Sequence, residues 1–364
     1  MTLMDLKGQD RKLRVAVLMG GSSSEREVSL VSGQMIAKAL DPDRYEVTAL
    51  DTRDLFRLTG SCAPPLSAIS APPESATKRI GSAVRAGAPT PALAPASADR
   101  PDVVFIALHG KGGEDGTVQG MLEVLGLPYT GSGVLASALA MDKVMSKRVF
   151  KAADIPVIDG IYVSRAALSG CTEEAFNRFS LPEIEAYPGF PLFVKPNAGG
   201  STCGCSLVTE PAALYGAVRE ALKFDDTALI ERYVKGTEIT IGVLDFPGES
   251  LMALPVIEIV PKSEYYDYES KYAAGGSEHI IPARIPAALI DQAQEIARQC
   301  HALLGCRGVS RTDIIVSDDR LYVLEVNTIP GMTPTSLLPQ AAEHAGIPFS
   351  QLLDRIIRSA IDRN

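Results

Sequence analysis

The chain has 364 residues, 46% hydrophobic and 22% charged, so it is long enough for two or three domains with sizeable cores. Its net charge of −9 argues against a nucleic-acid or anionic-membrane partner, although a local group of lysines can still hold nucleotide phosphates. The first residues lack the apolar core of a signal peptide, and no run of about 18 apolar residues occurs, so we expect a cytoplasmic protein without membrane contact.

The first third of the chain alternates strand-like and helix-like patterns, which is typical of α/β domains. Buried strands are predicted at 14–19, 45–50 and 103–108. Helices are predicted from about Val28 to Leu40 and from Thr117 onwards. Residues 60–100 are rich in Ala, Pro and Ser and have little periodicity, so we interpret them as a partly disordered insertion.

Two loops that follow these strands carry candidate functional residues. Glu25 lies near a helix start, where it is either a helix cap or a carboxylate for the ammonium group of an amino-acid substrate. His109 opens a glycine-rich loop and is either a proton carrier, an electrophile or a structural residue. The sequence leaves these alternatives open.

The middle of the chain centres on a second glycine-rich loop, at 196–204. A helix is predicted over 138–153, then strands at 191–195 and 205–208 on either side of the loop. Backbone N–H groups of such a loop can cradle phosphate, although a plain β-hairpin turn fits equally well. The loop lacks the Gly-Lys-Ser/Thr of a P-loop, and a strand follows it where a dinucleotide fingerprint needs a helix.

Lysines near this loop are candidate phosphate ligands. Lys143 and Lys195 could supply two positive charges to a triphosphate, or they could be surface lysines. Cys203 and Cys205 could form a ligand pair, but the six cysteines and four histidines fit no zinc spacing, so free thiols are the simpler interpretation.

The last third of the chain begins with a predicted strand over 228–233 that contains Glu231. Adjacent antiparallel strands are predicted at 238–244 and 251–259, and helices at 287–304 and at the C-terminus. Between them, residues 263–277 form a long, polar, Tyr-rich loop. A loop of that length inside a compact domain is usually a lid or a binding loop.

A hairpin near residue 320 is the most informative pattern in the sequence. Strands at 308–316 and 321–326 flank a polar turn at 317–320. Because strand side chains alternate faces, Arg311 and Asp313 share one face, and Glu325 and Asn327 share one face of the next strand. Two carboxylates and an amide oxygen suit Mg²⁺ with substrate phosphates. The alternative is a solvated hairpin face with a surface ion pair.

Seven motifs in order resemble the D-alanine–D-alanine ligase family of the ATP-grasp superfamily. They are GGSSSEREVSL at 20–30, HGKGGEDGT at 109–117, YTGSG at 129–133, MDK at 141–143, YDYESKY at 266–272, RTD at 311–313 and EVNTIPGM at 325–332. The resemblance covers nearly the whole chain except the first dozen residues and the insertion.

The resemblance implies an α/β, three-domain ATP-grasp architecture. An N-terminal, Rossmann-like parallel-sheet domain (12–131) would be followed by two α+β domains (132–232 and 233–364) that sandwich ATP. The implied reaction joins two D-alanines through a D-alanyl phosphate, for peptidoglycan precursors. The implied cofactors are ATP and two Mg²⁺ or Mn²⁺ ions, and the implied assembly is a homodimer.

Roles for individual residues also follow from the resemblance, position by position. For the substrates, Glu25 would hold the ammonium group of the first D-alanine, with His109 nearby, and Glu25, Ser201 and Tyr272 would close the lid. Arg311 and the Gly331 N–H would stabilise the oxyanion. Lys271 and Ser336 would hold the carboxylate of the second D-alanine. For ATP, Lys143 and Lys195 would bind phosphates with Ser201 and Lys271 nearby, Glu231 and Glu238 would contact adenine and ribose, and Tyr233 and Val234 would lie beside adenine. The metal ligands would be Asp313, Glu325 and Asn327.

One departure from the family pattern concerns the central loop. Many members carry Arg-Glu-Gly-Ser-Ser there, whereas this chain has Gly199 at the acidic position, which leaves the anchoring of the loop in doubt. By analogy, Tyr272 favours an amine as the second substrate. The alternatives are a D-Ala–D-Ser or D-Ala–D-lactate ligase, or a nucleotide-binding regulator without ligase activity.

Overall fold

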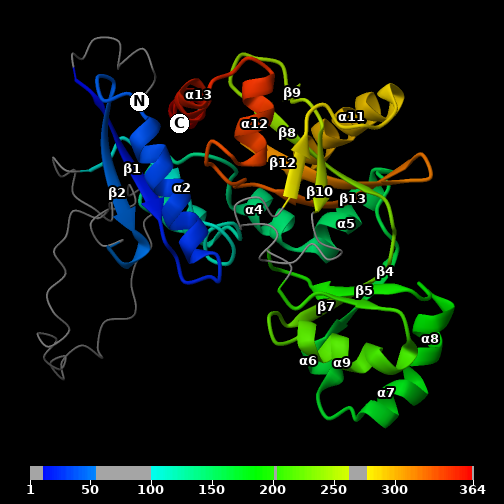
Figure 1. The fold of residues 1–364 in the computed structure, drawn as a ribbon. Coiled ribbons are helices and arrows are strands. Elements are labelled where there is room, and N and C mark those ends of the chain that lie inside the picture. Colours follow the sequence, from blue (N-terminus) through cyan, green and yellow to red (C-terminus); the bar gives the residue numbers. More distant parts are fainter. Residues whose placement is uncertain (1–10, 55–99, 201–202, 262–276, 363–364) are drawn as a thin grey trace, which may run out of the picture.

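The computed structural model describes residues 11–54, 100–200, 203–261 and 277–362 (Figure 1). Most of the predicted insertion at 60–100 and of the predicted loop at 263–277 lies outside these residues. No helix in the described ranges has the length and apolar character needed to cross a membrane.

The N-terminal part is built on a parallel sheet with strand order β2-β1-β3. The predicted elements of this part are confirmed. They are the strands β1 (Leu13–Met19), β2 (Tyr45–Asp51) and β3 (Val103–Ile106) and the helices α2 (Arg26–Ala39) and α3 (Thr117–Val124). Most of β1 is buried, as its continuous apolar run predicts for a parallel strand covered on both faces. The loops after β1 and β3 therefore emerge at the same edge of the sheet.

The helix predicted over 138–153 is two helices, so that prediction is wrong in its continuity. The helices α4 (Val134–Met141) and α5 (Lys143–Ala152) meet at Asp142, which has extended backbone angles. The Asp142 carboxylate accepts a hydrogen bond from Met145 N at 2.9 Å. Asp142 is therefore the N-cap of α5, and the cap interrupts a continuous apolar pattern.

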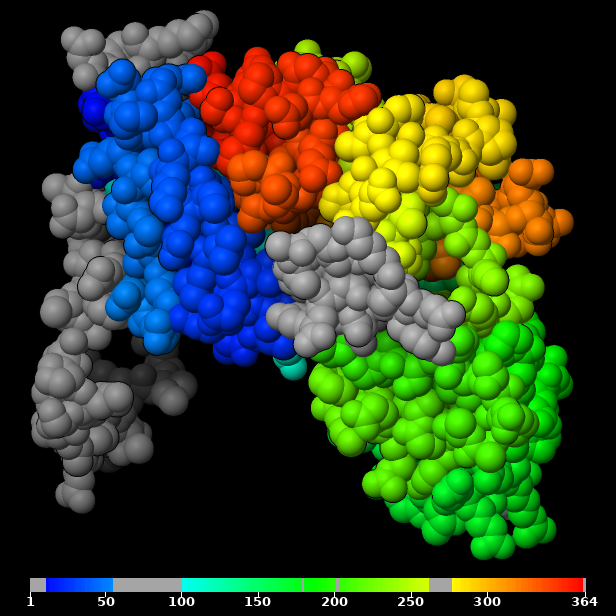
Figure 2. Space-filling view, viewed as in Figure 1, coloured from blue at the N-terminus to red at the C-terminus, as the bar shows by residue number. Residues whose placement is uncertain are grey.

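A four-stranded antiparallel sheet with order β4-β7-β5-β6 follows. Its strands are β4 (Gly160–Ser164), β5 (Leu192–Pro196), β6 (Ser206–Val208) and β7 (Thr227–Arg232), and its helices are α6 (Arg165–Leu168), α7 (Glu173–Phe179), α8 (Leu181–Ala186) and α9 (Pro211–Ala221). This part has its own core, which includes Phe176, Leu192 and Ile230. It forms the green lobe in Figure 2.

The C-terminal sheet has the order β11-β10-β8-β12-β13, and β9 also pairs with β8. Its strands are β8 (Thr237–Asp245), β9 (Met252–Ala253), β10 (Ile257–Pro261), β11 (Ser277–Ile280), β12 (Gly308–Ser317) and β13 (Arg320–Asn327), and its helix is α11 (Ala287–Leu304). The strand predicted over 251–259 is therefore interrupted, although both of its pieces pair antiparallel with β8 as expected.

The predicted hairpin is β12 and β13, joined by Asp318 and Asp319 between the paired Ser317 and Arg320. Both aspartates have positive φ, of 49° and 57°, which matches the twist that a two-residue hairpin turn requires.

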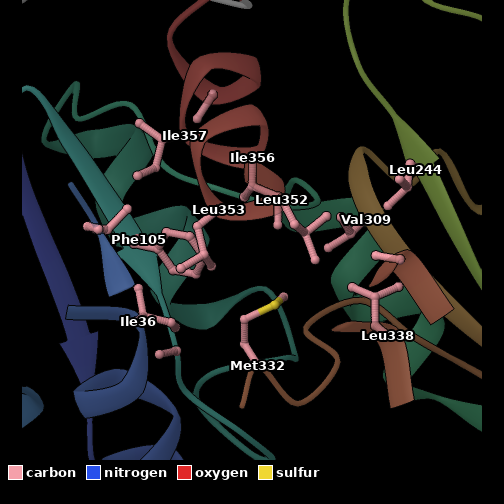
Figure 3. Packing of buried hydrophobic residues seen from close by; sticks show 14 of the residues in the cluster. Ile36, Phe105, Leu244, Val309, Met332, Leu338, Leu352, Leu353, Ile356 and Ile357 are labelled. Carbon is pink, nitrogen blue, oxygen red and sulfur yellow. The ribbon is translucent and has the colours of Figure 1, made fainter. Parts of the chain in front are cut away.

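Two helices, α12 (Leu337–His344) and α13 (Phe349–Asp362), end the described chain. Leu352, Leu353 and Ile357 of α13 join one buried cluster with Phe105 of the N-terminal sheet and Val309 of the C-terminal sheet (Figure 3). The helices α4 and α5 contribute to a second cluster with α11 and the C-terminal sheet. The domain bounds at 131/132 and 232/233 stay predictions.

Candidate active site

The face of the β12–β13 hairpin holds an ion pair of the expected residues. Arg311 Nε and Nη2 lie 3.0 and 2.9 Å from the two carboxylate oxygens of Asp313, and Thr240 Oγ1 donates to Asp313 Oδ1 at 2.6 Å. Both side chains are mostly buried, at 17% and 19% exposed. The face is therefore not a freely solvated surface, and that alternative loses its main support.

Glu325 lies directly opposite Asp313, and Asn327 lies opposite Arg311. Lys143 Nζ is 2.9 Å from Glu325 Oε2, and Asn327 Oδ1 accepts a hydrogen bond from Ile329 N at 2.9 Å. The predicted oxygen donors therefore share one face of adjacent strands, as a Mg²⁺ site completed by phosphate and water requires. In the described ranges, no group of three or more His, Cys, Asp or Glu side chains is arranged to hold a metal.

A buried charge cluster lies between α5 and the four-stranded sheet. Lys195 Nζ is 2.7 Å from Glu231 Oε2, and Lys147 Nζ contacts Glu231 Oε1. Burial alone would lower the Lys195 pKa, but the Glu231 carboxylate raises it above the ordinary value. Lys143 and Lys195 are less than 10% exposed, so they are not surface lysines.

The glycine-rich loop after β5 is held by α5. Val144 N donates to Asn197 Oδ1 at 2.8 Å, and Lys143 Nζ donates to the Gly199 carbonyl at 2.8 Å. Ala198 N donates to Asp225 Oδ2 at 2.7 Å. The backbone around Gly199 thus has anchors that need no acidic side chain at that position.

Glu25 connects this loop to the N-terminal part. Its side chain makes no capping hydrogen bond to α2, although it occupies the N-cap position, and it is 6% exposed. A Cβ atom added to Gly200 would lie 2.9 Å from Glu25 Oε1, and one added to Gly110 would lie 2.7 Å from Oε2. The carboxylate is therefore packed between two glycine loops, which favours the substrate interpretation over the cap.

His109 and Glu114 lie in the glycine loop that meets Glu25. Burial lowers the His109 pKa, although the Glu25 carboxylate and a backbone hydrogen bond to Ile329 favour the charged form. Gly110 N donates to Glu114 Oε2 at 2.6 Å. Burial and the Glu25 carboxylate raise the pKa of Glu114 to about 8. Both groups are therefore favoured in their neutral forms at neutral pH.

The loop after β13 brings Gly331 and Ser336 together. A Cβ atom on Gly331 would lie 3.1 Å from Ser336 Oγ, and that oxygen accepts a hydrogen bond from Thr333 N at 3.1 Å. The two residues are thus held close together by one turn before α12, and their roles toward the substrate stay predictions.

The linker between the two antiparallel sheets carries the predicted adenine residues. Tyr233 is 36% exposed, and its N–H donates to Pro191 O at 2.8 Å. Val234 and Glu238 are half-buried, and Glu231 is 2% exposed. Glu231 is the last residue but one of β7, and Glu238 is the second residue of β8, so a base between them would contact both sheets.

Three predicted residues, Ser201, Lys271 and Tyr272, lie outside the described residues, so their roles stay predictions. Conversely, sequence reasoning missed Lys147 and Glu114. Lys147 is four residues after Lys143 and shares its helix face, and Glu114 is inside the quoted motif at 109–117. Those two signals could have identified both residues.

Comparisons with known proteins identify the family to which the chain is related. Family models described as D-ala D-ala ligase N-terminus and C-terminus match residues 14–132 and 149–358. The D-alanine–D-alanine ligase of Syntrophobacter fumaroxidans is 43% identical over 354 residues, which are 96% of this chain and 98% of that protein. That of Geobacter sulfurreducens is 41% identical, over 95% of this chain and 94% of its own.

Solved structures give the same result. The crystal structure of the Bacillus anthracis ligase complexed with ATP has a TM-score of 0.72 and 33% identity, and covers 96% of this chain and 97% of its own. The VanG D-Ala:D-Ser ligase of Enterococcus faecalis has a TM-score of 0.72 at 28% identity, over 96% of this chain and all of its own. The predicted α/β ATP-grasp fold is thereby confirmed, and the chain belongs to the D-alanine–D-alanine ligase family.

Proposed function

We propose that this chain joins two D-alanines into D-alanyl-D-alanine and converts ATP to ADP and phosphate. The observation that carries the proposal is the position of Glu25, a buried carboxylate that is packed against Gly110 and Gly200. A carboxylate there suits an amino-acid ammonium group, and the phosphate-binding candidates Lys143 and Lys195 lie on the elements that flank the Gly200 loop. One site can thus hold an amino acid beside a nucleotide.

The first step activates a carboxylate. A carboxylate oxygen of the first D-alanine attacks the γ-phosphorus of ATP, the bond to the β–γ bridging oxygen breaks, and ADP leaves. Lys143 and Lys195 offset charge on the phosphates, since an ammonium group close to the developing charge stabilises the transition state. Glu25 holds the ammonium group of the substrate. Because His109 is neutral, it does not compete with that ammonium group for the Glu25 carboxylate.

The second step forms the peptide bond. The neutral amine of the second D-alanine attacks the acyl carbon, and its nitrogen then releases a proton to solvent. The bond between the acyl carbon and the bridging oxygen breaks, and phosphate leaves with that oxygen and the electron pair. Arg311 and the Gly331 N–H would stabilise the tetrahedral oxyanion. Ser336, beside Gly331, would hold the second carboxylate, together with Lys271. Ser201 and Tyr272 would exclude water, which would otherwise hydrolyse the acyl phosphate.

A divalent cation fits the donor set of Asp313, Glu325 and Asn327. Mg²⁺ or Mn²⁺ bound there would neutralise charge on the phosphates and orient them. We expect two ions by family resemblance. Arg311 and Lys143 pair with two of these donors, so both cations are close enough to act beside such a metal.

The cellular setting follows from the same resemblance. We propose a cytoplasmic homodimer that supplies peptidoglycan precursors. Light scattering on the purified chain measures the molar mass in solution, and a dimer should have twice the 38.7 kDa mass of one chain.

Product analysis tests the reaction and the choice of second substrate. The purified chain is incubated with ATP, Mg²⁺ and D-alanine, with D-serine or D-lactate added as competitors, and the products are identified by mass spectrometry. D-alanyl-D-alanine should dominate. A predominance of the D-Ala–D-Ser or D-Ala–D-lactate product would move the assignment within the family. Stable nucleotide binding without any D-alanine product would favour the regulator.

A further inference from the structure

Lys147 is a buried lysine with no role in the reaction described so far. It follows Lys143 by one helical turn on α5, so the two side chains share a face of the helix. Lys147 is 6% exposed, whereas lysines are almost never fully buried unless they are paired. Its position therefore needs a physical reason.

The partner of Lys147 is a carboxylate that a second lysine also uses. Lys147 Nζ contacts Glu231 Oε1, while Lys195 Nζ lies 2.7 Å from Oε2. Glu231 is 2% exposed. Two buried ammonium groups thus share one buried carboxylate, so the cluster carries one positive charge more than Glu231 can neutralise. A nucleotide phosphate is the kind of anion that would balance the surplus.

The second ammonium group matters because one of the two lysines in this cluster is expected to bind phosphate. Lys195 is expected to bind a phosphate, yet it is bonded to Glu231. If Lys147 were absent and Lys195 turned to a phosphate, the buried Glu231 carboxylate would have no ammonium partner. An uncompensated buried charge is strongly destabilising. With Lys147 on Oε1, the carboxylate stays neutralised and oriented while Lys195 moves.

The pKa values of the two lysines shift in opposite directions. Burial lowers the Lys147 pKa to about 8, and Lys195 and Lys143 add to that effect, while Glu231 opposes it. The Glu231 carboxylate instead raises the pKa of Lys195 above its ordinary value. Lys147 is thus the ammonium group that the site compensates least.

We propose that Lys147 is a positioning residue for nucleotide recognition: it holds Glu231 ionised and oriented as the acceptor for the adenine amine, and so releases Lys195 for the phosphates. The inference rests on the proposed function, in which Glu231 contacts the base and Lys195 the phosphates. An ionised carboxylate accepts from the amine of adenine and repels the carbonyl of hypoxanthine, so Lys147 should support discrimination between ATP and ITP.

The test is Lys147→Met in the full chain, which keeps an unbranched side chain, one atom shorter, and removes its charge. We expect the Kd for ADP and the KM for ATP to rise roughly tenfold to a hundredfold, the cost of losing a charged hydrogen bond. At saturating ATP, kcat and the KM for D-alanine should stay within about threefold of the wild type. The preference for ATP over ITP should fall by about tenfold, because Glu231 is left without an ammonium partner when Lys195 turns to the phosphates, and a Glu231 that then takes up a proton can donate to the carbonyl.

A matched control lies on the same helix. Lys151 pairs with Asp159 at 3.2 Å, but both side chains are about half exposed. Lys151→Met removes the same charge from α5 and should change neither ADP affinity nor the base preference, since exposed ion pairs contribute little. If Lys147→Met does not fold, Lys147→Gln takes its place, with the same direction of change expected.

A double variant separates positioning from a merely structural role. In a Glu231→Gln background, residue 231 has no negative charge for Lys147 to stabilise. Adding Lys147→Met to that background should therefore change the Kd for ADP by less than about threefold. Equal ADP affinity and equal base preference in wild type and Lys147→Met would overturn the inference, as would additive losses in the double variant. These binding measurements do not need turnover, so absence of D-alanine ligation in the wild type would contradict the proposed function separately.

Discussion

Asp313 and Glu325 face each other across the hairpin, and each is paired with a cation of the chain, Arg311 or Lys143. Both cations are also expected to act on the substrates. The proposed metal ligands are therefore paired with the proposed phosphate- and oxyanion-binding groups, so removing one carboxylate should affect chemistry far more than folding.

Glu325→Gln is the direct test at this position. The amide keeps the shape but is a much weaker metal ligand, so we expect D-alanine-dependent phosphate release to fall by about a hundredfold or more. The protein should still fold and bind ADP. Glu295→Gln, on the exposed face of α11 beside Arg298, is the control and should keep full activity. Near-normal turnover of Glu325→Gln at saturating Mg²⁺ would rule out the metal assignment.

Glu114 predicts a pH dependence of stability. Its pKa is about 8 in the folded chain and about 4.3 when unfolded, so the unfolded chain loses this proton at a lower pH. The stability that Glu114 contributes is present below pH 4.3 and is lost as the pH rises towards 8. Glu114→Gln mimics the neutral acid and does not titrate.

The measurement is the melting temperature of both proteins without ligands at pH 6 and pH 8.5. The wild type should lose stability relative to Glu114→Gln as the pH rises, because only the wild type has a carboxyl group at this position that ionises. A difference between the two that stays constant, or that changes in favour of the wild type, would contradict the neutral assignment of Glu114.

Several of these residue positions could be predicted from the sequence, because period-two alternation alone places Arg311 with Asp313 and Glu325 with Asn327. The charge cluster of Lys147, Lys195 and Glu231 could not, since its members come from three elements. Their meeting depends on how α5 packs against a sheet, which no local pattern specifies.

At the scale of elements, a bulge decides where Glu325 points. The register of β12 and β13 shifts between Asp313 and Ile314, so that Asp313 faces Glu325 while Ile314 faces Val323. Leu321 and Val323 are buried, and strict alternation would bury Glu325 with them. The extra residue, Leu324, restores Glu325 to the face of Asp313, in the way that bulges re-aim side chains near active sites.

Local rules account for most of the other elements, and capping explains the main error. The apolar pattern runs through residue 142 without a break, so periodicity predicts one helix, while the Asp142 side chain ends one helix and starts the next. The split matters for the site, because it places Lys143 at the first turn of α5, beside the glycine-rich loop.

Glycine at position 160 makes room for Glu231. A Cβ there would lie 2.5 Å from Ile230 O and 3.0 Å from the Cα and Cγ atoms of Glu231. Gly160→Ala should therefore cost about 1–3 kcal/mol of stability and weaken ADP binding. In contrast, Gly216 of α9 has open space around it, so Gly216→Ala should stabilise by about 0.5–1 kcal/mol. Denaturant unfolding and ADP titration measure both, and a harmless Gly160→Ala would contradict the tight approach of β4.

Across the whole molecule, α13 packs the C-terminal part of the described chain against the N-terminal sheet. Asp354 on α13 accepts a hydrogen bond from Tyr45 and pairs with Arg44 at 2.5 Å, while Leu353 is fully buried in the cluster shared with the N-terminal sheet. This arrangement holds the Glu25 and His109 loops against the part of the chain that carries Arg311. The sequence predicts a terminal helix but not the surface on which it packs.

Leu353→Ala should destabilise the protein by about 2–5 kcal/mol, because it leaves a cavity in that shared cluster. Leu303 of α11 is 42% exposed, and Leu303→Ala should stay within about 0.5 kcal/mol of the wild type. Denaturant unfolding gives both values. Equal small losses in the two variants would mean that α13 does not hold the N-terminal sheet in place.

In the proposed reaction, the carboxylate of the first D-alanine takes the γ-phosphoryl group of ATP. D-alanine labelled with ¹⁸O in its carboxylate tests this directly, by mass spectrometry of the released phosphate. The acyl phosphate route predicts one labelled oxygen in each phosphate and ADP as the nucleotide product. Unlabelled phosphate, or release of AMP and pyrophosphate, would contradict the assignment of this site to phosphoryl transfer onto D-alanine.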